Sequence, residues 1–309
     1  MVKSIKIYNN FNIKFNHKNS ILLIGNFDGL HLGHQKLFRL AQNFKKKYSL
    51  KIGVLTFEPM PKMFFDKSLT NFRISNQNQK ITLLKKFNVD FVIIKKFDKE
   101  FSKTKSINFI KKILSKKLKA KFIFVSNNFR FGNKREGNVK QLIKFEALCK
   151  YKIIKPQPLS QSRKVISSTL IRRLLENGNL NKVNKFLNRH WSIYGKVIKG
   201  RQLGKKIGFP TANIDIKDYV LAKPGVYAVR VKKQNSEKFI KGIANLGYRP
   251  TFNQKKILLE VHLFNFSENL YNKYLTVNFL KFIRKEKKFK DIGQLKKQIK
   301  IDLQKAKKI

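Results

Sequence analysis

The sequence predicts a doubly wound parallel α/β domain followed by a small antiparallel β-barrel with a C-terminal helix. Three observations support this prediction. The chain has 309 residues, which is beyond the size at which a single hydrophobic core usually stops growing. In the first half, continuous apolar runs alternate with segments of helical periodicity. From Trp191 onward, short strand-like runs are separated by turns, with no long helix until the end.

The first domain is expected to alternate strands and helices. Its strands are short and continuously apolar, as parallel strands are when both faces of their sheet are covered. They are predicted at 21–25, 52–57, 91–95, 122–126 and 151–155. Helices are predicted at 34–47, 77–87, 106–118 and 139–149, then at 168–177 and 180–186. Ligands of such a sheet bind at the carboxyl ends of its strands.

The second domain is expected to be a barrel. Its strand-like runs are WSIYGKVI, GVYAVRVKK, KFIKGIANLG, ILLEVHLFNF and YLTVNFLKFI. The final helix is predicted at 291–307, because Ile292, Leu295, Ile299 and Leu303 share one face. We place the boundary near residues 186–191, so the domains are predicted at 1–186 and 187–309.

The net charge of +53 suggests a nucleic-acid partner at first sight. However, lysine supplies 58 of the 70 basic residues and arginine only 12, although arginine is the better ligand for phosphates and bases. The lysines are spread over every segment beside abundant Asn, Ile and Phe, a pattern that a compositional bias explains. We therefore do not expect nucleic acid as a partner, although the positive field should attract anionic substrates.

Other classes are excluded by what the sequence lacks. Cys149 is the single cysteine, so an internal disulfide or a zinc site of several thiolates is excluded. The first ten residues, MVKSIKIYNN, lack the apolar core of a signal peptide. No run has the length of a membrane span. We expect a cytoplasmic protein, and the sequence leaves its oligomeric state open.

The stretch GNFDGLHLGH at 25–34 follows the first predicted strand and leads into a helix. A helix N-terminus has unpaired N–H groups and a partial positive charge, so it binds phosphate. His31 and His34 would lie beside that end. The alternative is that one histidine caps the helix and the other packs against it.

These residues resemble the HxGH signature of Rossmann-like nucleotidylyltransferases, on Asp28, Gly29, His31, Gly33 and His34. Three further segments are similar to bacterial FAD synthetases: VLTFEPMP at 54–61, NNFRFGNKREGN at 127–138 and ISSTLIRRLLENG at 166–178. Met60 stands where that family often has histidine, and Ser126 where it often has glycine. A class I aminoacyl-tRNA synthetase would need a KMSKS-like loop after the last strand, whereas KMFFDKS at 62–68 follows only the second.

The resemblance implies transfer of the adenylyl group of ATP to FMN, which forms FAD and releases pyrophosphate. A phosphate nucleophile is already ionised, so the site needs to align two anions and neutralise charge rather than supply a strong base. By the resemblance, His31, His34 and Arg172 act in catalysis. The implied nucleotide-binding residues are Gly25, Asn26, Phe27, Asp28, Gly33, Ser167, Ser168 and Thr169. The implied flavin-binding residues are Asn128, Phe129 and Arg130. Ser167–Thr169 would also suit a helix N-cap.

The stretch GRQLGKKIGFPTANI at 200–214 has three glycines within nine residues. It lacks the GK[ST] ending of a Walker loop, and by itself a tight barrel turn explains it equally well. It resembles the glycine loop and PTAN motif of riboflavin kinases. KPGVYAV, ANLGYRPTF, LEVHLFNF and NKYLTVNFLKFIRKEKKF match that family in order, whereas Lys205 and Lys206 replace a frequent Gly-Arg pair. The implied ATP- and Mg²⁺-binding residues are Gly204, Gly208, Pro210, Thr211 and Asn213, with Thr211 and Asn213 at the metal.

A kinase that acts on an alcohol needs a carboxylate to accept the hydroxyl proton. Glu260 lies in a predicted strand between Leu259 and Val261, where a carboxylate is costly. The resemblance makes Glu260 the catalytic base, and the alternative is an exposed strand residue. It also implies that Arg284 contacts the flavin. We interpret His262, which shares the face of Glu260, as structural.

The two motif sets together resemble the bifunctional riboflavin kinase/FAD synthetase family. The resemblance implies that the barrel phosphorylates riboflavin with ATP and that the α/β domain adenylylates the FMN, both with Mg²⁺. Two alternatives remain at this point. One is an FMN adenylyltransferase with a non-catalytic barrel, and the other is a basic nucleic-acid-binding protein on a relic nucleotidylyltransferase fold.

Overall fold

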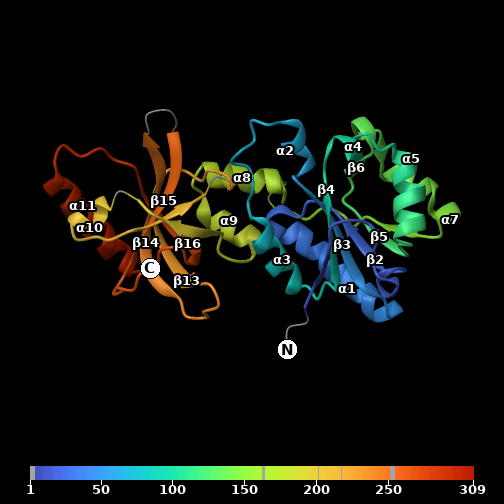
Figure 1. Cartoon of the computed structure of the whole chain (residues 1–309), viewed down its shortest axis with the longest axis horizontal. Helices are drawn as coiled ribbons and strands as arrows, with labels where there is room; N and C mark the ends of the chain where they lie inside the picture. The colour runs from blue at the N-terminus through green and yellow to red at the C-terminus, as the bar shows by residue number, and fades with distance from the viewer. Residues whose placement is uncertain (1–3, 162–163, 201, 217, 251–254) are drawn as a thin grey trace. The chain divides into compact units, whose positions relative to one another are not determined.

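The computed structural model describes residues 4–161, 164–200, 202–216, 218–250 and 255–309 (Figure 1). The chain forms two compact units. The first consists of Met1–Leu69 and Gln77–Ile166, and the second of Thr70–Asn76 and Ser167–Ile309. The two predicted architectures are confirmed, one in each unit.

The first unit is built on a parallel sheet of six strands, in the order β1-β4-β3-β2-β5-β8. Their bounds are β1 Lys6–Tyr8, β2 Ile21–Ile24, β3 Ile52–Glu58, β4 Phe91–Lys96, β5 Phe122–Phe124 and β8 Lys152–Ile154. The five predicted strands are all present. The edge strand β1 was not predicted, because it has three residues and none of them is buried.

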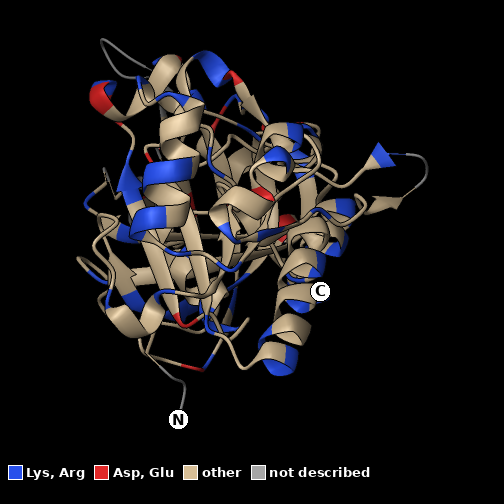
Figure 2. Ribbon diagram, turned by 90° about the vertical axis from the view of Figure 1, so that its right-hand side faces the viewer, with Lys and Arg blue, Asp and Glu red and all other residues tan. Residues whose placement is uncertain are grey.

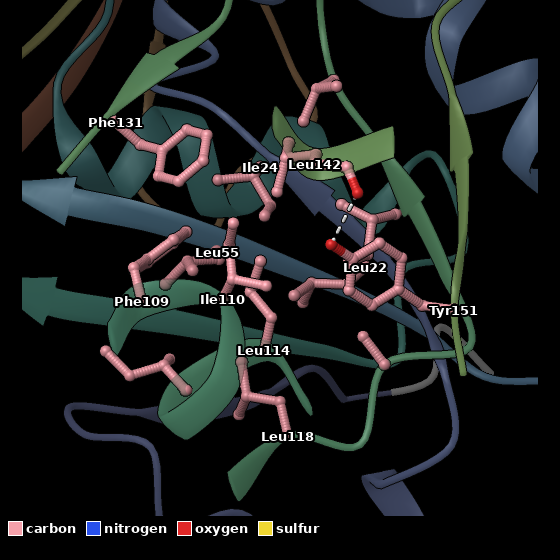
Figure 3. Packing of buried hydrophobic residues seen from close by; sticks show 14 of the residues in the cluster. Leu22, Ile24, Leu55, Phe109, Ile110, Leu114, Leu118, Phe131, Leu142 and Tyr151 are labelled. Atoms are coloured by element: carbon pink, nitrogen blue, oxygen red, sulfur yellow. Dashed lines mark hydrogen bonds between the residues drawn. The ribbon is translucent and has the colours of Figure 1, made fainter. Parts of the chain in front are cut away.

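Helices cover both faces of this sheet, because alternate residues of each buried strand point to opposite sides. Leu22 and Ile24 pack with η3 (Phe109–Lys117) and α6 (Val139–Lys144), and Figure 3 shows this core, with the Tyr151 hydroxyl donating to the Leu142 carbonyl at 2.8 Å. Ile21 and Leu23 pack on the other side with α1 (Leu32–Tyr48) and α3 (Gln77–Lys85).

Two predicted helices differ from their expected form. The segment predicted at 106–118 begins as a short α5 (Ser106–Asn108) and continues as the π-helix η3. The segment predicted at 139–149 breaks at Phe145 into α6 and α7 (Glu146–Cys149). The other short elements of this unit are η1 Phe15–His17, η2 Asp28–Leu30, α2 Pro61–Phe65, α4 Lys99–Ser102, β6 Arg130–Phe131, η4 Asn133–Arg135, β7 Gly137–Asn138, β9 Ser160–Gln161 and β10 Lys164–Val165.

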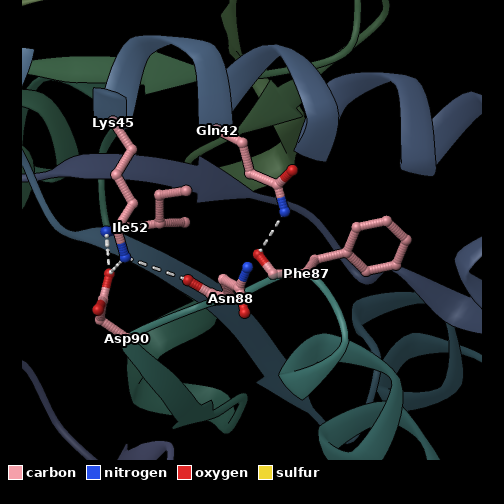
Figure 4. A network of polar contacts seen from close by, with 6 residues as sticks. All are labelled: Gln42, Lys45, Ile52, Phe87, Asn88 and Asp90. Atoms are coloured by element: carbon pink, nitrogen blue, oxygen red, sulfur yellow. Dashed lines mark hydrogen bonds and ion pairs between the residues drawn. The ribbon is translucent and has the colours of Figure 1, made fainter. Parts of the chain in front are cut away.

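A polar network holds the later part of α1 against the sheet (Figure 4). The Asp90 carboxylate accepts the backbone N–H of Ile52 at 2.8 Å and pairs with the Lys45 ammonium. Gln42 donates its side-chain amide to the Phe87 carbonyl at 3.0 Å. These contacts join the later turns of α1 to the start of β3 and to the segment between α3 and β4. They therefore restrain the direction of the helix whose first turn carries His34.

The second unit contains a closed barrel in the order β11-β12-β15-β14-β13-β16, with every neighbouring pair antiparallel. Its strands are β11 Ser192–Ile198, β12 Ala212–Asp215, β13 Gly225–Lys233, β14 Ile240–Pro250, β15 Lys255–Leu263 and β16 Tyr274–Lys285. Its helices are α8 Ser168–Glu176, α9 Leu180–Leu187, α10 Leu203–Lys206 and α11 Ile292–Lys307. The strand β12 was not predicted, since it has four residues and directly follows the glycine-rich loop.

The helix α11 packs on the barrel by a face slightly different from the predicted one. Leu303 and Ala306 contact the apolar cluster of β13 and β14. Ile292, which we expected on the buried face, is 61% exposed. Asp291 caps the helix by accepting the backbone N–H of Gln294 at 2.8 Å, so the first turn is fixed by its cap rather than by burial of Ile292.

Residues Thr70–Asn76 belong to the second unit although they precede most of the first in sequence. Residue Arg73 forms a parallel bridge with Tyr219. The Trp191 indole N–H donates to the Ile74 carbonyl at 3.0 Å, and the Asn76 amide donates to the Tyr194 carbonyl at 3.1 Å. This segment therefore completes the packing around the barrel.

Candidate functional sites

The predicted phosphate site lies at the topological switch point of the parallel sheet. The strand order reverses between β2 and β5, and the loops that follow these two neighbouring strands carry the predicted nucleotide and flavin residues. Ligands of doubly wound sheets bind at such a point, beyond the carboxyl ends of the strands. The structure thus brings residues 25–34 and 128–130 to the same edge of the sheet.

His31 is the N-cap of α1. Its Nδ1 accepts the backbone N–H of His34 at 3.4 Å, so the capping alternative is correct for this histidine. An accepting Nδ1 carries no hydrogen, so in the neutral ring the proton is on Nε2, which can donate to a phosphate. A Cβ on Gly33 would lie 3.1 Å from the His31 ring, which explains why glycine occupies that position.

His34 stacks on His31 with ring centroids 3.7 Å apart, and the edge of Phe27 contacts it at 5.3 Å. Its Nδ1 is buried without a hydrogen-bond partner in the described part of the chain. Burial lowers the pKa of His34 well below 6.5, and the charges of His31 and Lys80 lower it further. His34 is therefore a neutral imidazole at neutral pH, with hydrogen-bonding capacity that the protein itself does not use.

The turn between β2 and α1 has a compact backbone. Phe27 has a φ of +48° and Gly29 a φ of +76°. The Phe27 ring is buried, and a Cβ on Gly25 would approach it to 3.2 Å. Asp28 is 2% exposed, whereas Asn26 keeps some surface. The buried Phe27 ring thus packs beneath the turn against the core, and Asn26 is more accessible to solvent than Phe27 and Asp28.

The predicted flavin loop follows β5. The Ser126 hydroxyl donates to the Asn128 side-chain carbonyl at 2.9 Å, so the serine that departs from the family pattern fixes this asparagine. Phe129 stacks on Phe131 at 5.5 Å, and Arg130 is exposed in the β6–β7 hairpin. Met60 is only 2% exposed, so the other departure places an apolar side chain in the interior.

Sequence reasoning missed a buried lysine that acts on the pKa of His34. Lys80 on α3 is 2% exposed, and its ammonium lies 3.4 Å from the Thr56 hydroxyl at the end of β3. The sequence signal was its spacing: Lys80 lies four residues before the buried Leu84, on the face of the helix that packs against the core.

The remaining residues predicted for adenylyl transfer lie in the second unit. Ser167 is the N-cap of α8, and its hydroxyl accepts the backbone N–H of Leu170 at 3.2 Å. Ser168 and Thr169 form the first turn of that helix. The Arg172 guanidinium lies 3.7 Å from the centre of the Phe72 ring, and its Nε donates to the Phe72 carbonyl at 2.7 Å. Whether these residues act with His31 and His34 remains a prediction.

A cavity of about 450 Å³ lies at the barrel and collects most of the residues predicted for the kinase. Its lining includes Gly204, Thr211, Asn213, Glu260 and Arg284. Gly208 and Pro210 belong to the loop that leads to Thr211. The loop includes Lys205, whose side chain lies outside the described part of the structure.

Three adjacent strands place polar side chains at one level of this cavity. Glu260 on β15 pairs in register with Asn213 on β12 and with Asn245 on β14. The Oδ1 of Asn213 is buried without a hydrogen-bond partner in the described residues. A Cβ on Gly200 would lie 2.2 Å from the Asn213 amide nitrogen. Glycine at 200 therefore allows the loop to pack closely over Asn213.

The glycine loop needs glycine at two further positions. Gly208 has a φ of +93°, in the region that disfavours residues with a Cβ. At Gly204 a Cβ would lie 2.4 Å from the Phe209 carbonyl oxygen. The closely spaced glycines therefore reflect the shape of the loop that closes one side of the cavity.

Arg284 is held rigidly at the cavity wall. Its Nε donates to the Asp302 carboxylate at 2.8 Å and its Nη2 pairs with the same oxygen at 2.7 Å. Asp302 is 1% exposed on α11, and Gln298 donates to its other oxygen at 3.0 Å. Asp302 was not predicted from the sequence, because only the tertiary packing brings α11 to the end of β16.

The two units present two candidate sites of the kind found in nucleotide-dependent transferases. One lies at a helix N-terminus, and the other is lined by a carboxylate, an amide and a hydroxyl. A family model described as FAD synthetase matches residues 13–170, and one described as riboflavin kinase matches residues 187–309.

Whole-chain relatives give the same result. The chain is 41% identical over 294 residues to the bifunctional riboflavin kinase/FMN adenylyltransferase of Buchnera aphidicola subsp. Acyrthosiphon pisum, covering 94% of each protein. It is 40% identical over 286 residues to the protein of the same name from Haemophilus influenzae, covering 93% of this chain and 92% of that one. The chain belongs to the bifunctional riboflavin kinase/FMN adenylyltransferase family. It phosphorylates riboflavin to FMN and adenylylates FMN to FAD, with ATP as the donor.

A solved structure with the same fold carries a different name. It is described as a macrolide-efflux protein from Streptococcus pneumoniae, and it matches with a TM-score of 0.85 and 27% identity over 99% of both chains. In the described residues of this chain, no helix is both long and apolar enough to cross a membrane.

Proposed function

We propose that the barrel cavity is the riboflavin kinase site and that the turn between β2 and α1 is the adenylyltransferase site. The observation that supports the kinase site most strongly is the convergence of Thr211, Asn213 and Glu260 on one cavity of about 450 Å³. A volume in this range suits a ligand of the size of riboflavin. We also propose that the functional division falls between residues 186 and 187.

In the kinase site, Glu260 accepts the proton of the ribityl hydroxyl as that oxygen attacks the terminal phosphorus of ATP. Its strand has ladder partners on both sides, so the backbone that carries the carboxylate is held rigidly. The residues also fit Mg²⁺, because Asn213 has a buried oxygen without a partner and Thr211 adds a hydroxyl. Bound there with ATP, Mg²⁺ would neutralise phosphate charge.

The described residues contain no cluster of three or more His, Cys, Asp or Glu side chains that could hold a metal. The proposal needs no such cluster, because Mg²⁺ in phosphoryl transfer is bound by one or two protein oxygens, by substrate phosphates and by water. Thr211 and Asn213 would supply the protein oxygens.

In the adenylyltransferase site, the FMN phosphate attacks the α-phosphorus of ATP. His31 donates from Nε2, since its Nδ1 is occupied as the cap of α1. His34 adds a second neutral donor, and the N-terminus of α1 adds its N–H groups. We propose that Arg172 and residues Ser167–Thr169 contribute to ATP binding in this reaction, and that Asn128, Phe129 and Arg130 contact FMN.

Nucleic acid is not part of this proposal. Lysine and arginine residues are scattered over many helices and strands rather than gathered on one element (Figure 2). We also propose a cytoplasmic location, which the use of ATP as donor supports.

The assignment of the two sites is tested by separating the two reactions. The full chain is incubated with riboflavin, ATP and Mg²⁺, and in parallel with FMN, ATP and Mg²⁺, and the flavins are resolved by chromatography. Glu260→Gln should slow FMN formation by about 100- to 10,000-fold, the contribution of a general base, and leave FAD formation from FMN intact. His34→Ala should do the reverse, so that FMN accumulates.

Glu268→Gln is a matched control, because Glu268 is a surface carboxylate of the same unit that pairs with Lys233 at 2.7 Å. It should leave both reactions unchanged. If Glu260→Gln or His34→Ala stopped both reactions in a folded protein, the assignment of one reaction to each site would be wrong.

A further inference from the structure

The side chain of His262 connects the strand that carries Glu260 to the loop that carries Thr211. Glu260 and His262 are two residues apart on β15, so they share a face, and both line the cavity. The adjacent ladder between β12 and β15 ends with Ala212 opposite Val261. Continuing that antiparallel register by one residue places Thr211 beside His262, at the point where the backbone ladder stops.

At that point His262 bonds the loop through its ring. Its Nδ1 lies 2.8 Å from the Pro210 carbonyl oxygen. A carbonyl oxygen carries no hydrogen, so Nδ1 is the donor. Proline has no N–H of its own and cannot extend the ladder. The imidazole therefore supplies a hydrogen bond where the backbone no longer does.

This contact has a direct consequence for Thr211. The Pro210 carbonyl and the Thr211 N–H belong to one planar peptide group, so a bond that holds the carbonyl also fixes the direction of that N–H and the start of the Thr211 side chain. The Phe209 ring meets His262 edge-on, with ring centroids 6.0 Å apart, and this contact restrains the imidazole from the loop side.

We propose that His262 is a positioning residue of the kinase site: it holds the Pro210–Thr211 peptide so that Thr211 and the following Asn213 face MgATP. This inference rests on the proposed roles of Thr211 and Asn213. His262 takes no proton from the substrate, which remains the task of Glu260. It acts through the loop and therefore affects the nucleotide and Mg²⁺ rather than riboflavin.

The test compares two substitutions of His262 in the full chain. In His262→Phe the ring and its contact with Phe209 remain, but the donor is lost. In His262→Asn the side-chain amide nitrogen occupies the position of Nδ1 and can donate to the same carbonyl. Initial rates of FMN formation are measured while ATP, Mg²⁺ and riboflavin are varied separately, and the fluorescence of the buried Trp191 reports that the second unit is folded.

His262→Phe should raise the KM for MgATP and the Mg²⁺ concentration for half-maximal rate by about 3- to 10-fold, the effect of one neutral hydrogen bond. The KM for riboflavin should not change, and His262→Asn should restore most of the loss. A merely structural histidine would lower the amount of active enzyme without this selectivity. Unchanged MgATP and Mg²⁺ dependence in His262→Phe, or equal damage in His262→Asn, would overturn the proposal.

Thr211→Val separates this inference from the site assignment. If Thr211→Val leaves the kinase reaction unchanged, the proposed role of Thr211 is wrong, and the positioning role fails with it. If Thr211→Val weakens MgATP binding but His262→Phe does not, only the positioning role is refuted. If His262→Phe does not fold, His262→Gln places its amide one bond beyond the Nδ1 position. It should then show the same selective rise in the MgATP and Mg²⁺ requirements, and its absence would refute the proposal.

Discussion

Asn213 should lower the stability of the ligand-free second unit while it contributes to MgATP binding. Its residue is 5% exposed, and its Oδ1 is buried without a partner in the described residues. An unpaired buried acceptor costs about 1–3 kcal/mol relative to a solvated or apolar group. Leucine has nearly the same shape and no polar atom. We therefore expect Asn213→Leu to raise the stability of the ligand-free second unit by about 1 kcal/mol or more, while MgATP binding weakens.

The single tryptophan makes this effect measurable in one unit. Trp191 is 1% exposed in the second unit, so its fluorescence follows unfolding of that unit. For a domain of this size, 1 kcal/mol corresponds to about 2–4 °C in Tm. MgATP at 100 times its Kd stabilises the native protein by about 2.7 kcal/mol. A tenfold loss of affinity removes about 1.4 kcal/mol of this, so about half of the ligand-induced shift should disappear in Asn213→Leu.

Thr211→Val is the matched control, because Thr211 lines the same cavity but is only half-buried. It should also reduce the MgATP-induced shift, yet leave the Tm without ligand unchanged within about 1 °C, since no buried unpaired atom is removed. If Asn213→Leu lowers the Tm without ligand, Oδ1 is paired in solution. If it keeps the full MgATP-induced shift, Asn213 does not contribute to the nucleotide or metal site. Either result refutes the reasoning.

Two further predictions concern stability. Because the pKa of His34 is lowered in the folded chain, the unfolded chain takes up the proton first as the pH falls below 6.5. The contribution of His34 to the free energy of unfolding is therefore fully present above pH 6.5. Below pH 6.5 this contribution decreases by up to about 1.4 kcal/mol per pH unit. The free energy of unfolding is measured with urea at pH 7.5 and at pH 5.5, and its decrease should be smaller in His34→Gln than in the parent protein. His17 and His190, whose pKa values are also lowered, titrate in both proteins and therefore do not affect the comparison. Trp191→Phe removes the bond to the Ile74 carbonyl and leaves a void, so it should cost about 2–3 kcal/mol in urea unfolding followed by circular dichroism. A cost below 0.5 kcal/mol would contradict a structural role of this bond.

Most of the fold could be predicted because the hydrophobic pattern is strong where burial is complete. The strands β2, β3, β4 and β5 are short apolar runs with hardly any exposed residue. Such runs can be recognised as buried strands from the sequence. β1 and β12 are too short for a period to be visible. The break at Phe145 and the π-helix at Phe109–Lys117 depend on packing, which local periodicity does not contain.

The docking of residues Thr70–Asn76 was beyond sequence reasoning for a similar reason. Its hydrogen bonds join residues about 100 or more positions apart, as in the Phe72–Arg172 and Ile74–Trp191 contacts. No local pattern in the segment distinguishes it from an ordinary loop. The same holds for Asp302, which reaches Arg284 only because α11 returns to the barrel.

The sequence indicated which residues would come together at the two candidate sites, but it could not indicate their protonation and hydrogen-bond partners. Spacing alone places His31 and His34 at a helix N-terminus, but it does not indicate which ring nitrogen of His31 carries no hydrogen. The bond from the His34 N–H to the His31 Nδ1 settles that point. For His262 the sequence favoured a structural role, and the bond to the Pro210 carbonyl now connects it to the glycine loop.

Unpaired buried atoms add a structural argument for the two proposed sites. In the described residues, four buried side-chain atoms lack a hydrogen-bond partner, in His34, Gln141, Asn213 and Arg230. The Gln141 amide still donates to the Ser106 hydroxyl at 3.1 Å, and the Arg230 guanidinium lies 4.7 Å over the Phe239 ring, so both side chains have other stabilising contacts. His34 and Asn213 differ because each lies in one of the two proposed sites, where we propose phosphate or Mg²⁺ to bind. A folded chain tolerates the cost of such an atom most readily where a ligand removes it. We therefore expect the ligand-free protein to lie slightly below its attainable stability at two places, one in each unit, and each of them belongs to one of the two proposed sites.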